Sequence, residues 1–389
     1  MSLVQNILTY CHSLKTALRE YGQLPETEQK QVWRDLSGTE AKGRLFIRGK
    51  EPSAFAREFE PPSLIDESLL KLDLELLRIN FHRKQAYNKA LKSNREYVLD
   101  KKFRLKFLRA EKFDAALAAS RLVLHFEEKL ELFGEFLLGR EVQLSDLDKD
   151  DLDTLNMGYL QVLSQPDTSN RKVLFYYKAI SDCYKRRENI LKVLWYVSNA
   201  ISEDEDVQKL GVVNVVYNVG GWVEHSFDYE KSRRVSRLFR AIPLRFASFF
   251  VCLDEGAWMT VVDAFSFMIS KYLRIRLRVI LGDHVESQEK LKAVGVPSSV
   301  LPIDNTKNKL LLDAHKKWIE SRREKEDQKY AAPDLDTEPF SAESVHFVDD
   351  AGDKDSNEAE DEKPGSQKLL VASEKSSSAS SASHHQVVG

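Results

Sequence analysis

Three arginines in the last third of the chain have a spacing that could bind phosphate. Arg274, Arg276 and Arg278 alternate with apolar residues in a segment that closes at Gly282. Successive side chains of a strand point to opposite faces, so the three cations are predicted to share one side. Arginine is suited to bidentate contact with phosphate. Together with Arg245, these residues are candidates for a site that binds an anionic headgroup or membrane phosphate; a solvated edge face is the alternative interpretation.

Other residues that could do chemistry lack the partners that catalysis needs. The chain contains no Gly-x-Ser-x-Gly, no Walker loop, no His-Glu-x-x-His and no Cys-x-x-Cys. Asp283 and His284 could form a dyad, but the histidine is expected in a solvated loop. His125 is expected to pack on an apolar helix, and Gly220-Gly221 lacks the spacing that cradles a pyrophosphate. The sequence therefore predicts a protein that is not an enzyme and needs no cofactor or metal.

An apolar segment offers a second candidate site. Residues Trp258 to Leu273 read as a helix with almost no polar face, and such a helix needs an apolar cover. It is either an ordinary core helix or a gate over a lipid cavity. In the second interpretation, alternate residues of the strand Phe246 to Leu253 form the floor of the pocket, and residues at helical spacing in the apolar segment close it. The predicted pocket residues are Phe249, Val251, Val262, Phe265 and Ile269.

The charge distribution limits the partners. The chain has a net charge of −3, but residues 333–389 hold 13 acids and 4 lysines, so the preceding part carries +6. A mildly basic body suits transient contact with anionic membranes, whereas the charge is too weak and scattered for nucleic acid. The acidic tail is a candidate site for protein partners.

Cysteine usage and hydropathy indicate a cytoplasmic protein. The three cysteines are widely spaced and are expected to be free thiols in a reducing compartment. The longest charge-free apolar run, Phe246 to Leu253, is far shorter than the ~20 residues that span a bilayer. The start of the chain does not have the pattern of a secretory signal. Membrane association is therefore expected to be transient.

Strands alternate with helices along the middle of the chain, which predicts an α/β fold with a mixed sheet. Strands are expected at Gly211–Tyr217, Phe246–Leu253 and Arg274–Leu281. One long amphipathic helix is expected over Ser63–Leu99, and a helix with a solvated basic face over Asp100–Arg109. The predicted organisation is an N-terminal extension (1–62), a helical module (63–140), a lobe (141–310), a charged C-terminal helix (311–332) and an acidic, Ser-rich disordered tail (333–389).

Three collinear segments carry a resemblance to a known family. Phe103–Glu127 begins "FRLKFLRAEKFD", which is similar to the "LLRFLRARKFD"-like run of the CRAL-TRIO family. Ala200–Trp222 resembles its acidic turn and following strand, and Ala241–Pro302 its strand, apolar helix, basic strand and Pro-terminated elbow. The resemblance spans Lys102 to Pro302 and implies a helical module followed by a mixed-sheet lobe with an apolar lipid pocket.

The chain departs from the family at several polar positions. Members that hold phosphatidylinositol carry Glu where this chain has Leu244 and Lys where it has Leu277. The strand before Gly220 ends in Tyr217 and Asn218 rather than Asp, and Ile303-Asp304-Asn305 replaces the usual Gly-Gly. The resemblance therefore does not imply phosphatidylinositol as the ligand.

The resemblance implies a non-enzymatic carrier. It would enclose one hydrophobic lipid in the pocket, exchange it at membrane surfaces and so serve lipid transport and membrane trafficking. The alternative, which the departures favour, is a regulatory or scaffold protein. Its lobe would be degenerate, and the N-terminal extension and the tail would bind protein partners.

Overall fold

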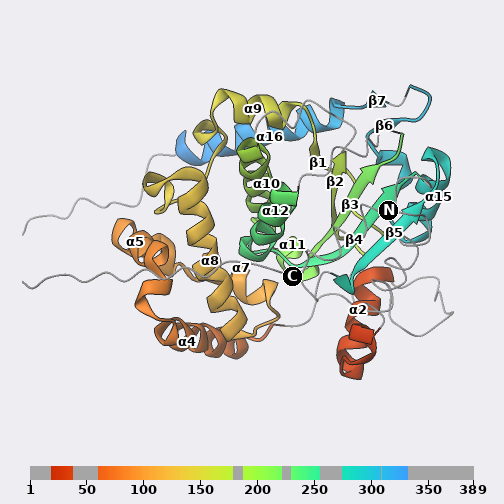
Figure 1. Ribbon diagram of the computed structural model, residues 1–389. Coiled ribbons are helices and arrows are strands. Elements are labelled where there is room, and N and C mark those ends of the chain that lie inside the picture. Colours follow the sequence, from red (N-terminus) through yellow and green to blue (C-terminus); the bar gives the residue numbers. More distant parts are fainter. Residues whose placement is uncertain are drawn as a thin grey trace, which may run out of the picture. The chain divides into compact units, whose positions relative to one another are not determined.

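The computed structural model describes residues 19–37, 60–177, 187–220, 229–254, 274–307 and 309–331 (Figure 1). Predicted site residues Val262, Phe265 and Ile269 lie outside these ranges, as does the tail. Within the described residues a helical N-terminal part precedes a mixed α/β sheet, so the predicted fold class is confirmed.

The helical part is built from short helices rather than one long one. It contains α4 (Pro62–Arg78), η1 (Phe81–Arg83), α5 (Gln85–Ser93), α6 (Arg95–Leu99), α7 (Lys101–Ala110), α8 (Ala115–Phe133) and η2 (Glu135–Leu137). The single helix expected over Ser63–Leu99 is wrong. Asn80 caps η1 and Asn94 caps α6, and each asparagine side chain accepts a backbone N–H, which favours a new helix start. No side-chain cap forms at the start of α4.

Three basic residues of α7 are buried, contrary to the expected solvated face, whereas Lys101 and Lys102 are exposed. Arg104, Lys106 and Arg109 are each less than 10% exposed. Each bonds to a carboxylate that is distant in the sequence: Arg104 to Asp73, Lys106 to Glu141 and Arg109 to Glu60. These ion pairs explain the burial, because an unpaired charge would be costly there.

Five strands form the main sheet in the order β1-β2-β3-β4-β5. They are β1 (Leu160–Val162), β2 (Lys172–Tyr177), β3 (Val212–Asn218), β4 (Phe246–Leu253) and β5 (Leu277–Leu281). Strands β2 to β5 are parallel, and β1 pairs antiparallel with β2. A separate two-stranded ladder joins β6 (Ile303–Asp304) and β7 (Lys309–Leu310).

Helices cover both faces of the sheet. One face packs against α9 (Lys149–Asn156), α10 (Arg187–Ile201) and α12 (Tyr229–Ala241). The opposite face packs against α15 (His284–Ala293) and the segment that leads through η6 (Ser298–Val300). Figure 1 shows α10 and α12 between the sheet and α8, with α15 on the far side. The connections from β2 to β3 and from β3 to β4 therefore run over the same face.

The helical part docks onto α10 and α12. His125 of α8 is buried, as expected, and its ring lies 4.4 Å from that of Trp195 on α10. Burial is the main cause that lowers the pKa of His125 well below its ordinary value. Glu128 of the same helix pairs with Arg234 and Arg237 of α12. A tilted aromatic pair and an ionic cluster thus join the two layers.

The remaining elements lie around the sheet. They are η3 (Leu144–Asp146), α11 (Glu205–Leu210), α16 (Asp313–Ala331) and α2 (Glu26–Ser37). Arg322 of α16 pairs with Glu203 at 2.8 Å and with Glu326 at 2.8 Å, and Glu326 accepts a hydrogen bond from Tyr196 of α10. Helix α2 contacts β4.

Candidate functional site

An apolar surface on the α10/α12 face of the sheet forms a cluster next to the main core, and Val216 and Leu277 at its margin pack against both. We call it the sheet floor. It consists of Val216, Val251, Leu253, Leu277, Val279 and Leu281. Strand alternation and register explain the grouping, because Val251 pairs with Val216 on one side and with Val279 on the other. Val251 and Leu253 are buried, whereas the other four are only partly buried.

The sheet floor begins where the cover of α12 ends. Phe239 of α12 packs on Phe246 and Phe249 of β4, with ring centroids 4.6 and 5.5 Å apart. Phe249 therefore belongs to the main core, and Val251, two residues further on, belongs to the sheet floor. Phe249 and Val251 share one face of β4, but Phe249 is covered by Phe239 of α12. The predicted role of both residues in lipid binding stays a prediction.

Polar side chains lie beside this apolar surface. Tyr176 donates a hydrogen bond to Asn214 at 3.1 Å, and the Asn214 amide donates to the backbone oxygen of Ser248 at 3.4 Å. Asn218 is 2% exposed, and within the described residues its Nδ2 group has no hydrogen-bond partner. A buried N–H without an acceptor is costly. A ligand oxygen at this place would satisfy it.

Sequence reasoning did not select Tyr176, Asn214 or Asn218 as site residues. A signal was present, because Asn214 and Asn218 interrupt the β-branched run Val212–Asn218 at a spacing of four. That spacing puts both amides on one strand face, the same face as Val216.

The arginines lie elsewhere than predicted. Arg276 is 3% exposed and pairs with Asp35 at 2.9 Å, and Arg245 pairs with the same carboxylate at 2.6 Å. Arg274 pairs with Glu20. Arg278 is exposed and lies on β5 opposite to the sheet floor. The expectation that the basic strand presents its cations together on a surface is wrong for Arg276, because strand β5 begins only after it and its guanidinium is buried against Asp35.

The two headgroup positions of the family are apolar in this structure as well as in the sequence. Leu244 is buried, and Leu277 is part of the sheet floor. Arg276 and Arg278 flank Leu277 and therefore point to the opposite face of the sheet. Neither can take the place of the family's lysine on the sheet floor.

His284 is not a solvated loop residue. It begins α15, stacks on Tyr217 and lies 3.0 Å from the Tyr217 hydroxyl through Nδ1. The carboxylate of Asp283 accepts the backbone N–H of Glu286 and so caps α15. The neighbouring acid therefore has a structural role in starting the helix.

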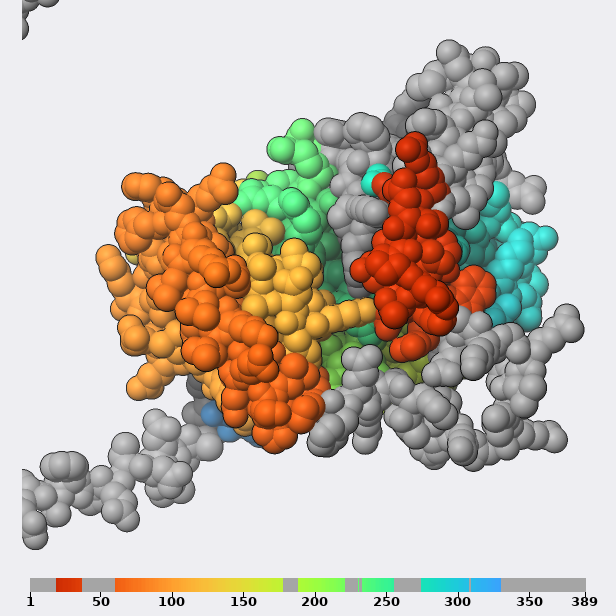
Figure 2. Space-filling model, turned by 90° about the horizontal axis from the view of Figure 1, so that it is seen from below, coloured from red at the N-terminus to blue at the C-terminus, as the bar shows by residue number. Residues whose placement is uncertain are grey.

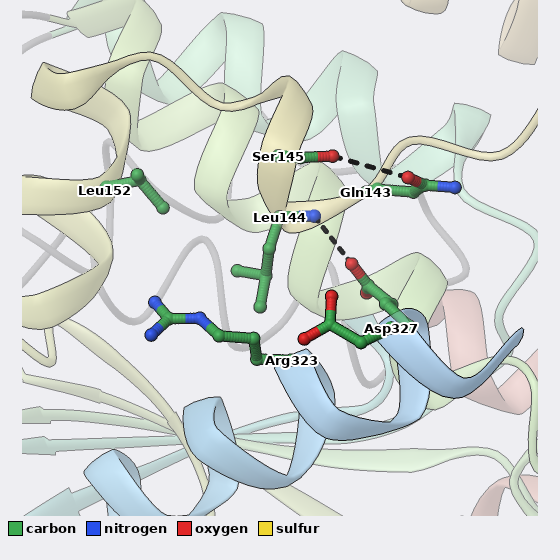
Figure 3. A pocket seen from close by; sticks show the side chains of 7 residues that line it. Gln143, Leu144, Ser145, Leu152, Arg323 and Asp327 are labelled. Carbon is green, nitrogen blue, oxygen red and sulfur yellow. Dashed lines mark hydrogen bonds between the residues drawn. The ribbon is translucent and has the colours of Figure 1, made fainter. Parts of the chain in front are cut away.

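A hollow of about 550 Å³ lies between η3, α9 and α16, away from the sheet floor (Figure 3). It is lined by Gln143, Leu144, Ser145, Leu152, Arg323, Glu326 and Asp327. Glu326 accepts the backbone N–H of Leu144 at 2.8 Å across it. Most of these side chains are polar or charged, whereas lipid sites are lined mainly by apolar groups.

The described residues contain no helix that is long and apolar enough to cross a membrane. In the same part of the chain, no three histidine, cysteine or acidic side chains gather as metal ligands.

Comparison with known proteins gives a likeness to solved structures alone. No family model matches the chain, and neither does any curated protein. The crystal structure of Sfh5 is similar at 11% sequence identity, with a TM-score of 0.40; the match covers 69% of this chain and 100% of that chain. A likeness at this level identifies no function.

Proposed function

We propose that the protein binds one hydrophobic lipid on the sheet floor and carries it between membranes. The observation that supports this proposal is the sheet floor itself. Six apolar side chains from three parallel strands form this cluster, and four of them are only partly buried. Covering such a surface with an apolar group is favourable by about 25 cal/mol of free energy per Å² of apolar area removed from water.

The segment that joins β4 to β5 is the proposed cover on the protein side. Strands β4 and β5 are parallel neighbours, and crossovers between such strands are right-handed in nearly all proteins. A right-handed crossover here would run over the same face as α10 and α12, which is the face of the sheet floor. The predicted gate residues Val262, Phe265 and Ile269 belong to this connection. The gate would contact acyl chain when closed and bilayer when open.

The polar groups beside the sheet floor favour an uncharged ligand end. Leu244 and Leu277 supply no charge, whereas the buried amide N–H group of Asn218 has no acceptor among the residues that the structure describes. A hydroxyl or carbonyl oxygen of the lipid fits this donor. Exposed Arg278 and the +6 charge of residues 1–332 suit a transient contact with anionic membranes from the cytoplasm.

A scaffold role is the second candidate. It would leave the sheet floor without cargo and use the N-terminal segments as binding elements. The ion pairs of α2 with Arg245 and Arg276 favour a regulatory use of that helix.

Lipid loading with a gate variant tests the proposal. The full chain is incubated with vesicles of total cellular lipid, re-isolated and extracted for mass spectrometry. We expect about one lipid per chain for the wild type and none for Phe265→Asp, because a charge that faces apolar cargo is costly. The melting temperature of Phe265→Asp should stay near that of the wild type. Normal loading of this variant would remove Phe265 from the site, and no loading of either protein would favour the scaffold.

A further inference from the structure

Helix α4 is apolar on two opposite faces. Its inner face packs in the core of the helical part, where Leu72 and Leu76 are buried and Leu69 is partly buried. Three other leucines of α4 and the first residue of η1 are between 50% and 75% exposed. We call this second group the outer ridge, and it consists of Leu70, Leu74, Leu77 and Phe81.

The spacing of the leucines explains why they form a second face. Leu70, Leu74 and Leu77 follow one another at intervals of four and three residues, which puts them on one side of a helix. With 3.6 residues per turn, Leu72 and Leu76 project from the opposite side. Phe81 follows four residues after Leu77, at the start of η1. Figure 1 shows α4 at the rim of the helical part, and Figure 2 shows it in orange on the face seen from below.

The surroundings of the outer ridge favour a membrane over a protein as its partner. All exposed residues of α5, α6 and α7 are polar or charged, so these helices add no apolar wall to the ridge. Helical peptides dock in grooves, whereas the ridge comes from one helix and its end. Its apolar area is on the order of a few hundred Å², the size of patches that mark interaction sites. A stable protein interface needs more, about 800 Å² on each partner.

The charges near the outer ridge fit an anionic surface. Each of the four acidic residues of α4 forms an ion pair with a basic residue. The pairs are Asp66–Lys101, Glu67–Lys71, Asp73–Arg104 and Glu75–Arg78. In contrast, Arg83 of η1 is exposed and has no acidic partner in the described part of the chain. The ridge is therefore flanked by compensated acids and ends near an uncompensated cation, which anionic lipids attract.

We propose that the outer ridge is a membrane-docking surface. Its four apolar side chains enter the boundary between headgroups and acyl chains of an anionic membrane, and Arg83 contacts the headgroups beside them. The inner face of α4 stays in its core, so the helical part binds the membrane without unfolding. The ridge takes no part in enclosing cargo, so this proposal stands or falls separately from lipid transport.

Co-sedimentation of the full chain with vesicles tests the proposal. The vesicles contain phosphatidylcholine and phosphatidylserine. We expect Leu70→Gln combined with Leu74→Gln to lower the partition coefficient at least about tenfold, because two leucines no longer enter the membrane. The matched control is Val285→Gln combined with Leu311→Gln, whose side chains are similarly exposed, at 62% and 47%, but lie outside the ridge. This control should bind as the wild type does, and both proteins should keep the wild-type melting temperature.

A single exchange separates the role of the cation from that of the apolar side chains. Arg83→Gln should weaken binding to the vesicles that contain phosphatidylserine about fivefold and leave binding to pure phosphatidylcholine vesicles unchanged. The proposal is overturned if the wild type does not bind either kind of vesicle. It is also overturned if the ridge variant binds as well as the wild type, or if the ridge variant and the control lose the same amount.

Sedimentation velocity without vesicles tests a second copy of the chain as the occupant of the ridge. We expect the wild type and the Leu70→Gln/Leu74→Gln variant to have the same sedimentation coefficient. A wild-type dimer that this variant converts to a monomer, together with unchanged vesicle binding, would make the ridge an interface between copies and overturn the proposal.

Discussion

Replacing Val279 by Asp places a carboxylate on the sheet floor at its least protected strand. Val279 is partly buried, lies on the edge strand β5 and pairs in register with Val251. At an edge position, strand propensity limits the folding cost to about 1 kcal/mol. In contrast, the loss of valine contact and the burial of a carboxylate against lipid together cost at least about 3 kcal/mol. Since 1.4 kcal/mol is tenfold in affinity, lipid binding should weaken about 100-fold or more.

The assay compares bound lipid and stability in the same preparation. Purified Val279→Asp is extracted for lipid by mass spectrometry and unfolded in urea. We expect no retained lipid and a folded protein. Val285→Asp is the control, because it makes the same exchange on α15 at a side chain that is 62% exposed; it should keep the lipid and change stability by less than about 0.5 kcal/mol. Wild-type lipid content in Val279→Asp would refute the sheet floor as a lipid-binding surface.

Three further predictions concern the layer between α8 and the lobe, each read from urea unfolding. Burial lowers the pKa of His125 in the folded protein. Between pH 7 and pH 5 the histidine therefore becomes protonated only in the unfolded state, so the free energy of unfolding should fall more for the wild type than for His125→Phe. Burial lowers the pKa of Lys129 to about 8 in the folded protein. Between pH 8 and pH 10.5 the folded state loses the lysine proton while the unfolded state keeps it, so the free energy of unfolding of the wild type should rise by up to about 3 kcal/mol relative to Lys129→Met. Glu128→Gln leaves Arg234 and Arg237 without this partner; because they are 22% and 37% exposed, the loss should be about 2 kcal/mol, below that of a fully buried pair. No difference from wild type in any one case would contradict that assignment.

The sequence predicted the strands well because their signal is local. The strand expected over Phe246–Leu253 is observed with those bounds, and the strand expected over Gly211–Tyr217 is shifted by one residue. Runs of apolar and β-branched side chains without charges identify central strands without knowledge of their neighbours.

The predicted helix boundaries are wrong in the segment Ser63–Leu99, where two capping residues lie inside the expected helix. Asn80 and Asn94 are good helix caps, but the apolar periodicity continues across them, so one helix was expected over Ser63–Leu99.

The buried ion pairs could not be predicted from local pattern. The partners of Arg276 and Arg245 at Asp35 are 241 and 210 residues away in the chain, and Glu60 lies 49 residues from Arg109. Sequence pattern predicts that a basic residue is exposed to solvent unless an acidic residue is near it in the sequence. Only the tertiary fold brings these acidic partners close. The sheet floor was accessible to sequence reasoning through alternation, whereas the buried amide of Asn218 was not recognised as a feature of a site.

Native lipid content is the most direct test of the central claim. The full chain is purified from the cells that produce it, without added lipid, and is analysed by native mass spectrometry and then by lipid extraction. We predict a complex with one lipid per chain, and its absence from Val279→Asp prepared in the same way. Wild-type protein that carries no lipid above the level of Val279→Asp would contradict the claim that the sheet floor binds cargo.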